Sequence, residues 1–175
     1  MALRDRLAER IIASLGDPDA RRELDALARD PCAWLGPDEA PWRSSVTERA
    51  RRASVALAGA PLTPPSDVDA ALAAAARLFD AALFFEVHEV LEPHWLVARG
   101  ETRDLLQGLI QIAVGWHHAA TGNVTGARSL LAEGAARLHG RELFGLPLDP
   151  FARAAAEAVA TLPRASPPTF PRRAR

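Results

Sequence analysis

Lysine is absent from this sequence, and all 21 basic residues are arginine. Because a Schiff base and a phosphate-binding P-loop each need a lysine amine, both kinds of chemistry are excluded. Cysteine is nearly absent, since Cys32 stands alone. One thiol cannot form an intramolecular disulfide or a multi-cysteine zinc site, and it is compatible with a reducing compartment.

Long apolar runs are also missing. The best candidate, residues 105–116, is shorter than a membrane span and contains Gln107 and Gln111. Asp5 and Glu9 interrupt the segment where a signal peptide would need an apolar core. The 22 acidic and 21 basic residues nearly balance, so charge gives no strong signal for nucleic acid. We therefore expect a cytoplasmic protein without a membrane segment.

Alternating runs of β-branched residues are absent too, and we expect no sheet. Helical periodicity and helix-start signals recur along the chain instead. The expected helices cover residues 3–15, 18–29, 45–58, 66–79, 83–99, 103–121, 124–139 and 151–162. With 49% hydrophobic and 25% charged residues the composition is globular, and we predict an all-α fold, a single-domain multi-helix bundle.

Composition divides this chain into three segments. Residues 1–65 are expected to form an N-terminal helical extension packed on the core. Residues 66–162 are expected to form the helical core domain. Residues 163–175, rich in proline and arginine, are expected to be a disordered tail.

The stretch FFEVHEVLEPHW, residues 84–95, places ionisable residues among core-type residues. At about 100° per residue, His88 and Glu92 fall in the middle of its apolar arc, and Glu89 lies at the edge of that arc. An ionised carboxylate buried without partners would cost several kcal/mol. These side chains therefore need polar partners from another helix.

The following helix carries a polar stripe that could supply those partners. Its members are Asp104, Gln107, Gly108, Gln111, Gly115 and His118. Each glycine inside a helix costs about 1 kcal/mol relative to alanine, which a solvent-facing stripe gives no reason to tolerate. We infer that this stripe faces the polar side of residues 84–95.

Together, FFEVHEVLEPHW, LLQGLIQIAVGWHHAATGN and GARSLL resemble domain-of-unknown-function family 309. The resemblance covers residues 74–138 and implies a small all-helical protein of a family with no established activity. The sequence departs from the family at residues 80–82, where relatives tend to have Asn and Gly, and at Pro93. The residues that match the family pattern are His88, Glu89, Leu91, Glu92, Trp95, Gln107, Gly108, Gln111, His118, Gly122, Asn123, Gly126 and Ala127.

The leading interpretation of the polar residues is a structural one. A buried hydrogen-bond network that is fully satisfied fixes the register of the helices it joins. On this interpretation the protein is a structural or interaction module, and its Leu- and Ala-rich helices are compatible with a homodimer. The network would comprise His88, Glu92, Gln107, Gln111 and His118.

Two alternatives use the same residues as a binding site. In the first, His88 and Glu92 hold a divalent metal from one helical turn, and His118 or Asp104 adds a ligand. Histidine with carboxylates suits Zn, Mn or Fe, although glutamine is a poor ligand for these ions.

The second alternative is a small-molecule pocket. Glu89 or Glu92 would be a base, and His88 or His118 a proton donor. Two glutamines, Gln107 and Gln111, would orient a polar ligand. No nucleophile is evident, so the sequence leaves open whether the protein is an enzyme.

Overall fold

The computed structural model describes residues 2–173, and the chain divides into two compact units, Met1–Glu86 and Val87–Arg175. The all-α prediction is confirmed, and each of the eight expected helices is present within a few residues of its expected bounds. The boundary at residue 86 differs from the expected one at residue 65, because α4 belongs to the same compact unit as the helices before it. Across residues 2–173, no helix combines the length and apolar character that a membrane crossing requires.

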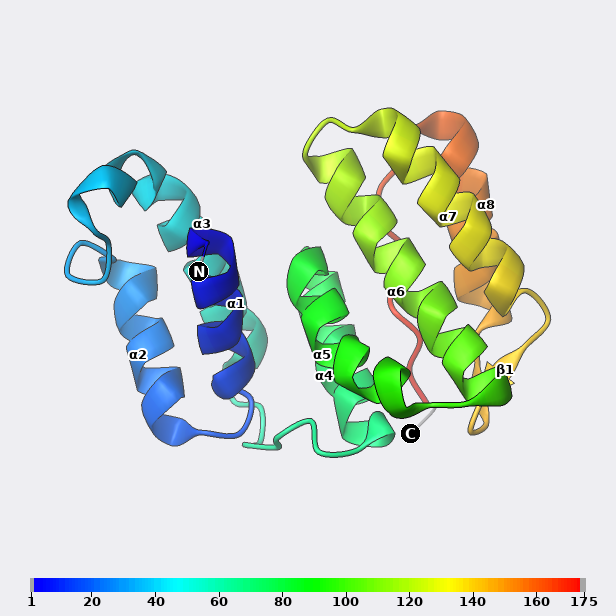
Figure 1. Ribbon diagram of the computed structural model, residues 1–175, viewed down its shortest axis with the longest axis horizontal. Coiled ribbons are helices and arrows are strands. Elements are labelled where there is room, and N and C mark those ends of the chain that lie inside the picture. Colours follow the sequence, from blue (N-terminus) through cyan, green and yellow to red (C-terminus); the bar gives the residue numbers. More distant parts are fainter. Residues whose placement is uncertain (1, 174–175) are drawn as a thin grey trace. The chain divides into compact units, whose positions relative to one another are not determined.

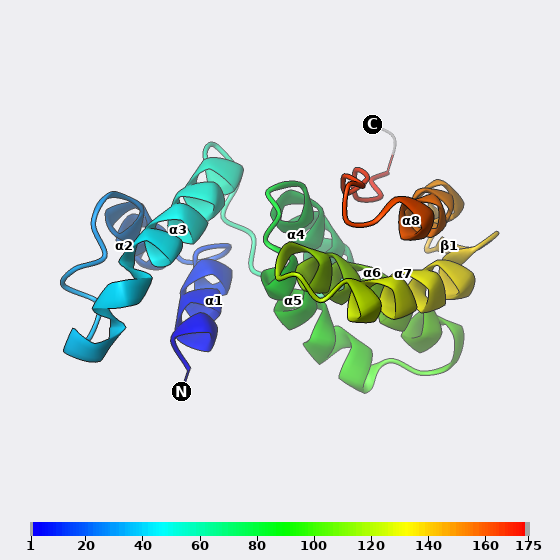
Figure 2. The same cartoon turned by 90° about the horizontal axis from the view of Figure 1, so that it is seen from above.

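In the first unit, capping residues and proline in the sequence mark where helices start. Asp17 caps α2, since its carboxylate accepts a hydrogen bond from the Asp19 backbone N–H at 2.8 Å, and Pro18 fills the first helical position. Figure 2 shows α1 beside α2 and α3, which contact one another. The elements are α1 (Leu3–Ala13), α2 (Pro18–Arg29), the 3₁₀ helix η1 (Pro37–Trp42), α3 (Arg43–Leu57) and α4 (Val68–Asp80).

In the second unit, α7 lies between α6 and α8 (Figure 1). Asn123 caps α7 by accepting a hydrogen bond from the Gly126 backbone N–H at 3.0 Å. The helix α5 begins in the first unit and continues into the second. The elements are α5 (Phe84–Val97), α6 (Gly100–Ala120), α7 (Val124–Leu138), β1 (Glu142–Leu143), β2 (Leu146–Pro147) and α8 (Asp149–Thr161).

The strands β1 and β2 correct the expectation of no sheet. They form an antiparallel hairpin in which Leu143 pairs with Leu146. The turn residues Phe144 and Gly145 both have positive φ, at 51° and 76°, as in tight hairpin turns. The expectation rested on the absence of alternating runs of β-branched residues. Strands of two residues are too short to show such a run, so this signal cannot detect them.

Glycines let α6 and α7 approach closely. A methyl group at Gly134 of α7 would lie 2.7 Å from the backbone carbonyl oxygen of Gly108 and 2.7 Å from Cγ1 of Ile112. A methyl group at Gly115 would lie 2.9 Å from Cγ of Leu131. The glycine stripe of α6 therefore packs against α7.

The C-terminal segment also differs from the expected disordered tail. Phe170 is only 1% exposed, and its ring centroid lies 5.3 Å from that of Phe151 in α8. Arg173 donates a hydrogen bond to the Phe144 carbonyl oxygen at 3.0 Å. Phe170 and Arg173 therefore attach this proline-rich segment to the rest of the unit. Residues 174–175 of the predicted tail lie outside the described residues.

We predict that Gly134→Ala lowers the free energy of unfolding by about 1–3 kcal/mol, because the added methyl group meets backbone that cannot move aside. Alanine's better helix propensity, about 1 kcal/mol, opposes this loss. Urea denaturation measures the change. As a control, Gly36→Ala should stay within about 0.5 kcal/mol, since φ there is −70° and the nearest atom is 3.6 Å away. Unchanged or raised stability in Gly134→Ala would contradict the close approach.

We also predict that Phe170→Ala costs about 3 kcal/mol of folding free energy, as expected for removal of a buried aromatic ring. Thr169→Ala is the matched control, because Thr169 is exposed in the same segment. Thermal and urea unfolding of both variants make the comparison. Equal stability of the two variants would show that the segment is not packed.

Candidate functional site

A compact group of ligand-type side chains lies on α5. The ring nitrogen Nδ1 of His88 lies 2.9 Å from Oε1 of Glu89, and Nε2 lies 3.9 Å from Oε1 of Glu92. One donor atom from each residue lies within 4.8 Å of the others. All three side chains are half-buried, with side-chain exposures of 28%, 32% and 41%. The group is therefore geometrically compatible with a metal ion while remaining open to solvent.

The helix produces this grouping by its spacing. His88 and Glu92 are four residues apart and lie on one face, one turn above the other. Pro93 does not end the helix, which continues to Val97. A proline has no N–H to donate to the carbonyl four residues earlier, so the carbonyl of Glu89 receives no bond from that position.

The turn before α5 keeps its shape without the Asn and Gly that the resemblance leads one to expect. Ala82 has φ of 57°, the left-handed region that favours glycine and asparagine. Its carbonyl oxygen accepts a hydrogen bond from Arg52 at 3.1 Å. The departure at residues 80–82 thus places an alanine in a strained conformation but leaves the turn in place.

The polar stripe of α6 contacts α7 through Gln111. Gln111, 8% exposed, donates from Nε2 to Oε2 of Glu133 at 2.9 Å and accepts at Oε1 from Nε of Arg137 at 3.0 Å. Both partners lie on α7, one turn apart. The inference that this stripe faces α5 is wrong for Gln111, as it is for the glycines beside it, because the close approach of α7 occupies that face of α6.

Charged residues extend this contact toward the start of α6. Asp104 pairs with Arg137. It also lies 3.9 Å from Arg141, which pairs with Glu101 at 3.0 Å. We call the whole contact, Glu101, Asp104, Gln111, Glu133, Arg137 and Arg141, the α6–α7 seam. Sequence reasoning missed its α7 members, although the four-residue spacing of Glu133 and Arg137 is a helix-face signal.

The remaining two candidates lie outside the group of three potential metal ligands. His118 contacts the chain just after its own helix, where its Nδ1 lies 3.1 Å from Nδ2 of Asn123. It is not a member of the group of potential metal ligands. Gln107 lines a surface depression together with Trp95, Arg103 and the seam residues Asp104 and Arg137. The six candidates thus separate into one group of three, the seam residue Gln111, Gln107 beside the seam, and His118 at the end of α6.

The most buried carboxylate of the motif is one that the helical projection did not single out. Glu86 is 1% exposed, and its Oε1 accepts a hydrogen bond from Nε of Arg49 in α3 at 2.6 Å. At about 100° per residue, Glu86 falls outside the apolar arc that holds His88 and Glu92, and no local signal connects it with an arginine so far away in sequence. This ion pair belongs to the first unit and neutralises a charge that burial would otherwise penalise.

Comparison with known proteins supports the resemblance stated above. Residues 72–130 match the family model described as "Domain of unknown function (DUF309)". The match includes the group on α5, all of α6 and the cap of α7. Neither a curated protein nor a solved structure matches the chain.

Removal of the Arg137 side chain tests the seam. We predict that Arg137→Ala lowers stability by about 1–3 kcal/mol, because Gln111 loses a donor to its buried amide oxygen. In a double-mutant cycle with Gln111→Ala, the coupling energy should be at least about 0.5 kcal/mol. Arg22→Ala is the control, since Arg22 is 72% exposed and pairs only with Asp19 at the surface. A coupling energy near zero would contradict the seam.

Proposed function

We propose that the DUF309 segment of this chain, residues 72–130, binds a divalent metal ion through His88, Glu89 and Glu92. The observation that carries the proposal is the gathering of three potential ligand atoms within 4.8 Å on one helix. Gln111 is engaged by α7, so it does not explain why these three residues lie together.

The spacing of the two residues one turn apart supports a shared ion. A histidine nitrogen binds zinc at about 2.0–2.1 Å and a carboxylate oxygen at about 2.0–2.2 Å, so two such ligands of one ion lie at most about 4.3 Å apart. The 3.9 Å between Nε2 of His88 and Oε1 of Glu92 falls within this limit. Small side-chain rotations would bring the pair to bonding distance.

Glu89 supports the same site in a second way. A metal-binding histidine commonly donates its other ring N–H to a carboxylate, which fixes the ring orientation. Glu89 lies at hydrogen-bond distance from Nδ1 of His88, on the far side of the ring from Nε2. Glu89 is therefore placed either as a third ligand or as the group that orients His88.

The donor set favours particular ions. One imidazole with two carboxylates suits Zn, Mn or Fe(II) better than thiophilic ions. Half-exposed side chains leave coordination positions for water, and a bound ion would polarise such a water molecule. The protein's contribution would be to hold the imidazole and the carboxylates in place on a regular helix.

Elemental analysis by inductively coupled plasma mass spectrometry tests the proposal on tag-free full-length protein. We expect near-stoichiometric metal that is lost in His88→Ala and in Glu92→Gln. In Glu89→Gln we expect metal affinity to fall at least tenfold, as for loss of an orienting carboxylate. Affinity should also fall as the pH is lowered, because each ligand must be deprotonated to bind.

His139→Ala is the matched control, because it removes an exposed histidine from the end of α7 and should leave the metal content unchanged. Circular dichroism of each variant checks that the fold is intact. A metal-free wild-type protein that also fails to bind added Zn²⁺ or Mn²⁺ would reject the site. That outcome would favour the other proposal, an interaction module in which these residues have a structural role.

A further inference from the structure

A small pocket lies where the end of α5 meets the start of α6, in the second unit. Its volume of about 240 Å³ is below the range of sites for drug-sized ligands and suits a ligand of few atoms. It contains none of the three residues of the proposed metal site. It is lined by Trp95, Gly100, Arg103, Asp104, Gln107 and Arg137.

Arg103 is held in this pocket with one edge of its guanidinium free. Its Nη1 donates to the carbonyl oxygens of Trp95 at 2.9 Å and Leu96 at 3.2 Å, and the guanidinium lies 4.1 Å from the centre of the Trp95 ring. Within residues 2–173, its Nε and Nη2 make no hydrogen bond, and no carboxylate lies at ion-pair distance from it. These two nitrogens form the fork that binds two oxygens of one carboxylate or phosphate group.

Gln107, one turn further along α6, offers a second free group. It is half-buried, and its amide makes no hydrogen bond to any other described residue. Gln111, one turn further again, uses both of its amide atoms on α7. Residues four apart lie on one helix face, so the Nε2 of Gln107 can donate to an oxyanion that Arg103 holds.

These free atoms are open to solvent. Arg103 and Gln107 are half-buried, yet neither contains a side-chain nitrogen or oxygen that lacks both a partner and accessible surface. In the described part of the chain, such enclosed atoms belong to Arg21, Arg49, Arg52 and Trp116. Since Arg103 and Gln107 line the pocket, a ligand there can contact them without a rearrangement of the fold.

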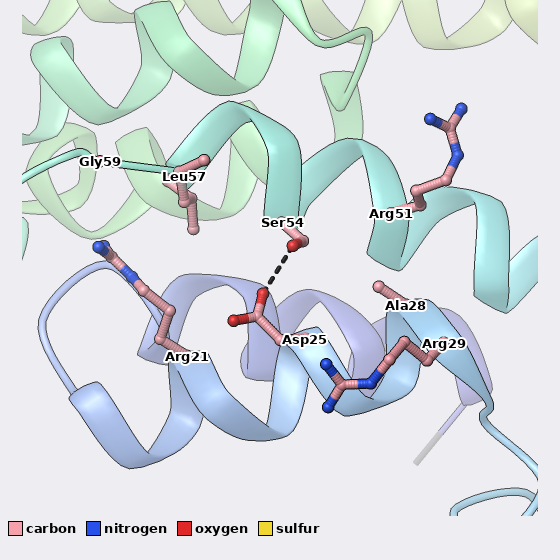
Figure 3. A pocket seen from close by; sticks show the side chains of 9 residues that line it. Arg21, Asp25, Ala28, Arg29, Arg51, Ser54, Leu57 and Gly59 are labelled. Carbon is pink, nitrogen blue, oxygen red and sulfur yellow. Dashed lines mark hydrogen bonds between the residues drawn. The ribbon is translucent and has the colours of Figure 1, made fainter.

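The groove between α2 and α3 in the first unit shows a different arrangement (Figure 3). There the Ser54 hydroxyl donates to Oδ1 of Asp25 at 2.6 Å. Arg51 pairs with Glu48 at 2.9 Å. These side chains have partners within the fold, whereas the amide of Gln107 has none among the described residues.

The charges around the pocket leave an excess of positive charge. Asp104 pairs with Arg137 and lies 3.9 Å from Arg141. Arg141 also pairs with Glu101 at 3.0 Å. Each of the two carboxylates therefore has an arginine of α7 or of the chain just after it. The charge of Arg103 is the one without a counter-ion in the described residues.

We propose that this pocket binds the oxyanion group, a carboxylate or a phosphate, of a small molecule. The Nε and Nη2 of Arg103 would donate to two oxygens of the group, and Nε2 of Gln107 would donate to one of them. The contact with Trp95 and the two backbone carbonyls holds the guanidinium in place before the ligand arrives, which lowers the entropy lost on binding. A cation would be repelled by Arg103.

Nuclear magnetic resonance titration of the full-length protein tests this proposal, with inorganic phosphate and acetate as probes. The protein is freed of metal first, because Trp95 follows Glu92 by three residues on one face of α5 and a bound ion would itself attract an anion. We expect at least one probe to shift the side-chain N–H signals of Arg103 and Gln107 to saturation. Sodium chloride at equal ionic strength should not. The two affinities show whether phosphate or carboxylate is preferred.

Two variants locate the binding. Arg103→Gln should lower the affinity at least tenfold, as for loss of a charged hydrogen-bonding group. Arg99→Gln is the matched control, because Arg99 also donates to a carbonyl of the α5 end, that of Ala98 at 2.9 Å, but does not line the pocket. It should leave the affinity nearly unchanged, since an exposed charge is screened.

Gln107→Glu keeps the size of the side chain and adds a carboxylate that would pair with Arg103 one turn away. It should abolish anion binding without lowering stability in urea. Circular dichroism of all three variants checks that the fold is intact.

Three results would overturn the proposal. These are no binding of either anion, equal loss of affinity in Arg103→Gln and Arg99→Gln, and unchanged affinity in Gln107→Glu. The last two would show a general attraction of anions to the surface. His88→Ala should leave anion binding intact and Gln107→Glu should leave the metal content unchanged, so failure here is separable from failure of the metal site.

Discussion

The close approach of α6 and α7 decides which partners the polar residues of α6 contact. Gly134 lies against the carbonyl of Gly108, and any side chain at Gly134 would meet backbone within 2.7 Å. This contact turns the face of α6 that carries Gly108 and Gly115 toward α7. Gln111, on the same face, then meets Glu133 and Arg137. A backbone contact that only glycine permits therefore fixes a side-chain hydrogen-bond pattern one turn away.

The free-energy cost of an unpaired polar side chain is lower on α5 than at Gln111. Gln111 is buried and needs its hydrogen bonds, since an unsatisfied buried amide costs about 1–3 kcal/mol. His88, Glu89 and Glu92 are half-exposed, and water can solvate them. Folding alone therefore does not require a partner helix for these three residues. Since their exposure leaves them accessible to a ligand, we propose a metal ion rather than a structural network at this position.

The sequence predicts the helices well because their signals are local. Asp17 with Pro18, and Asn123 before Val124, mark helix starts through contacts between near neighbours. The partner of the α6 stripe could not be predicted in the same way. A helical projection gives the angle at which a residue leaves its helix, but it does not say which helix lies there. The glycines of α6 indicated that another helix approaches closely. They did not indicate that this helix is α7.

The same limit explains the other differences between expectation and structure. The burial of Glu86 depends on Arg49, which is distant in sequence, and the packing of Phe170 depends on Phe151. Each contact joins two residues that are far apart in sequence. Neither contact produces a repeating pattern that could be recognised in the sequence. His88, Glu89 and Glu92 lie together because a single helical turn brings them together, whereas His118, expected as a further ligand from another helix, is not in this group.

Two arginines of the N-terminal unit show two ways in which the fold holds a partly buried charge. Arg49 is 17% exposed and meets the buried carboxylate of Glu86, so its charge is neutralised within the fold. Arg21 is held just as firmly, but by two carbonyl oxygens that carry no net charge. Folding could have paired Arg21 with Asp25, one turn away on the same helix. The carbonyl oxygens of Ser14 and Ala60 instead hold Arg21 away from Asp25, so neutral acceptors take the place of a counter-ion.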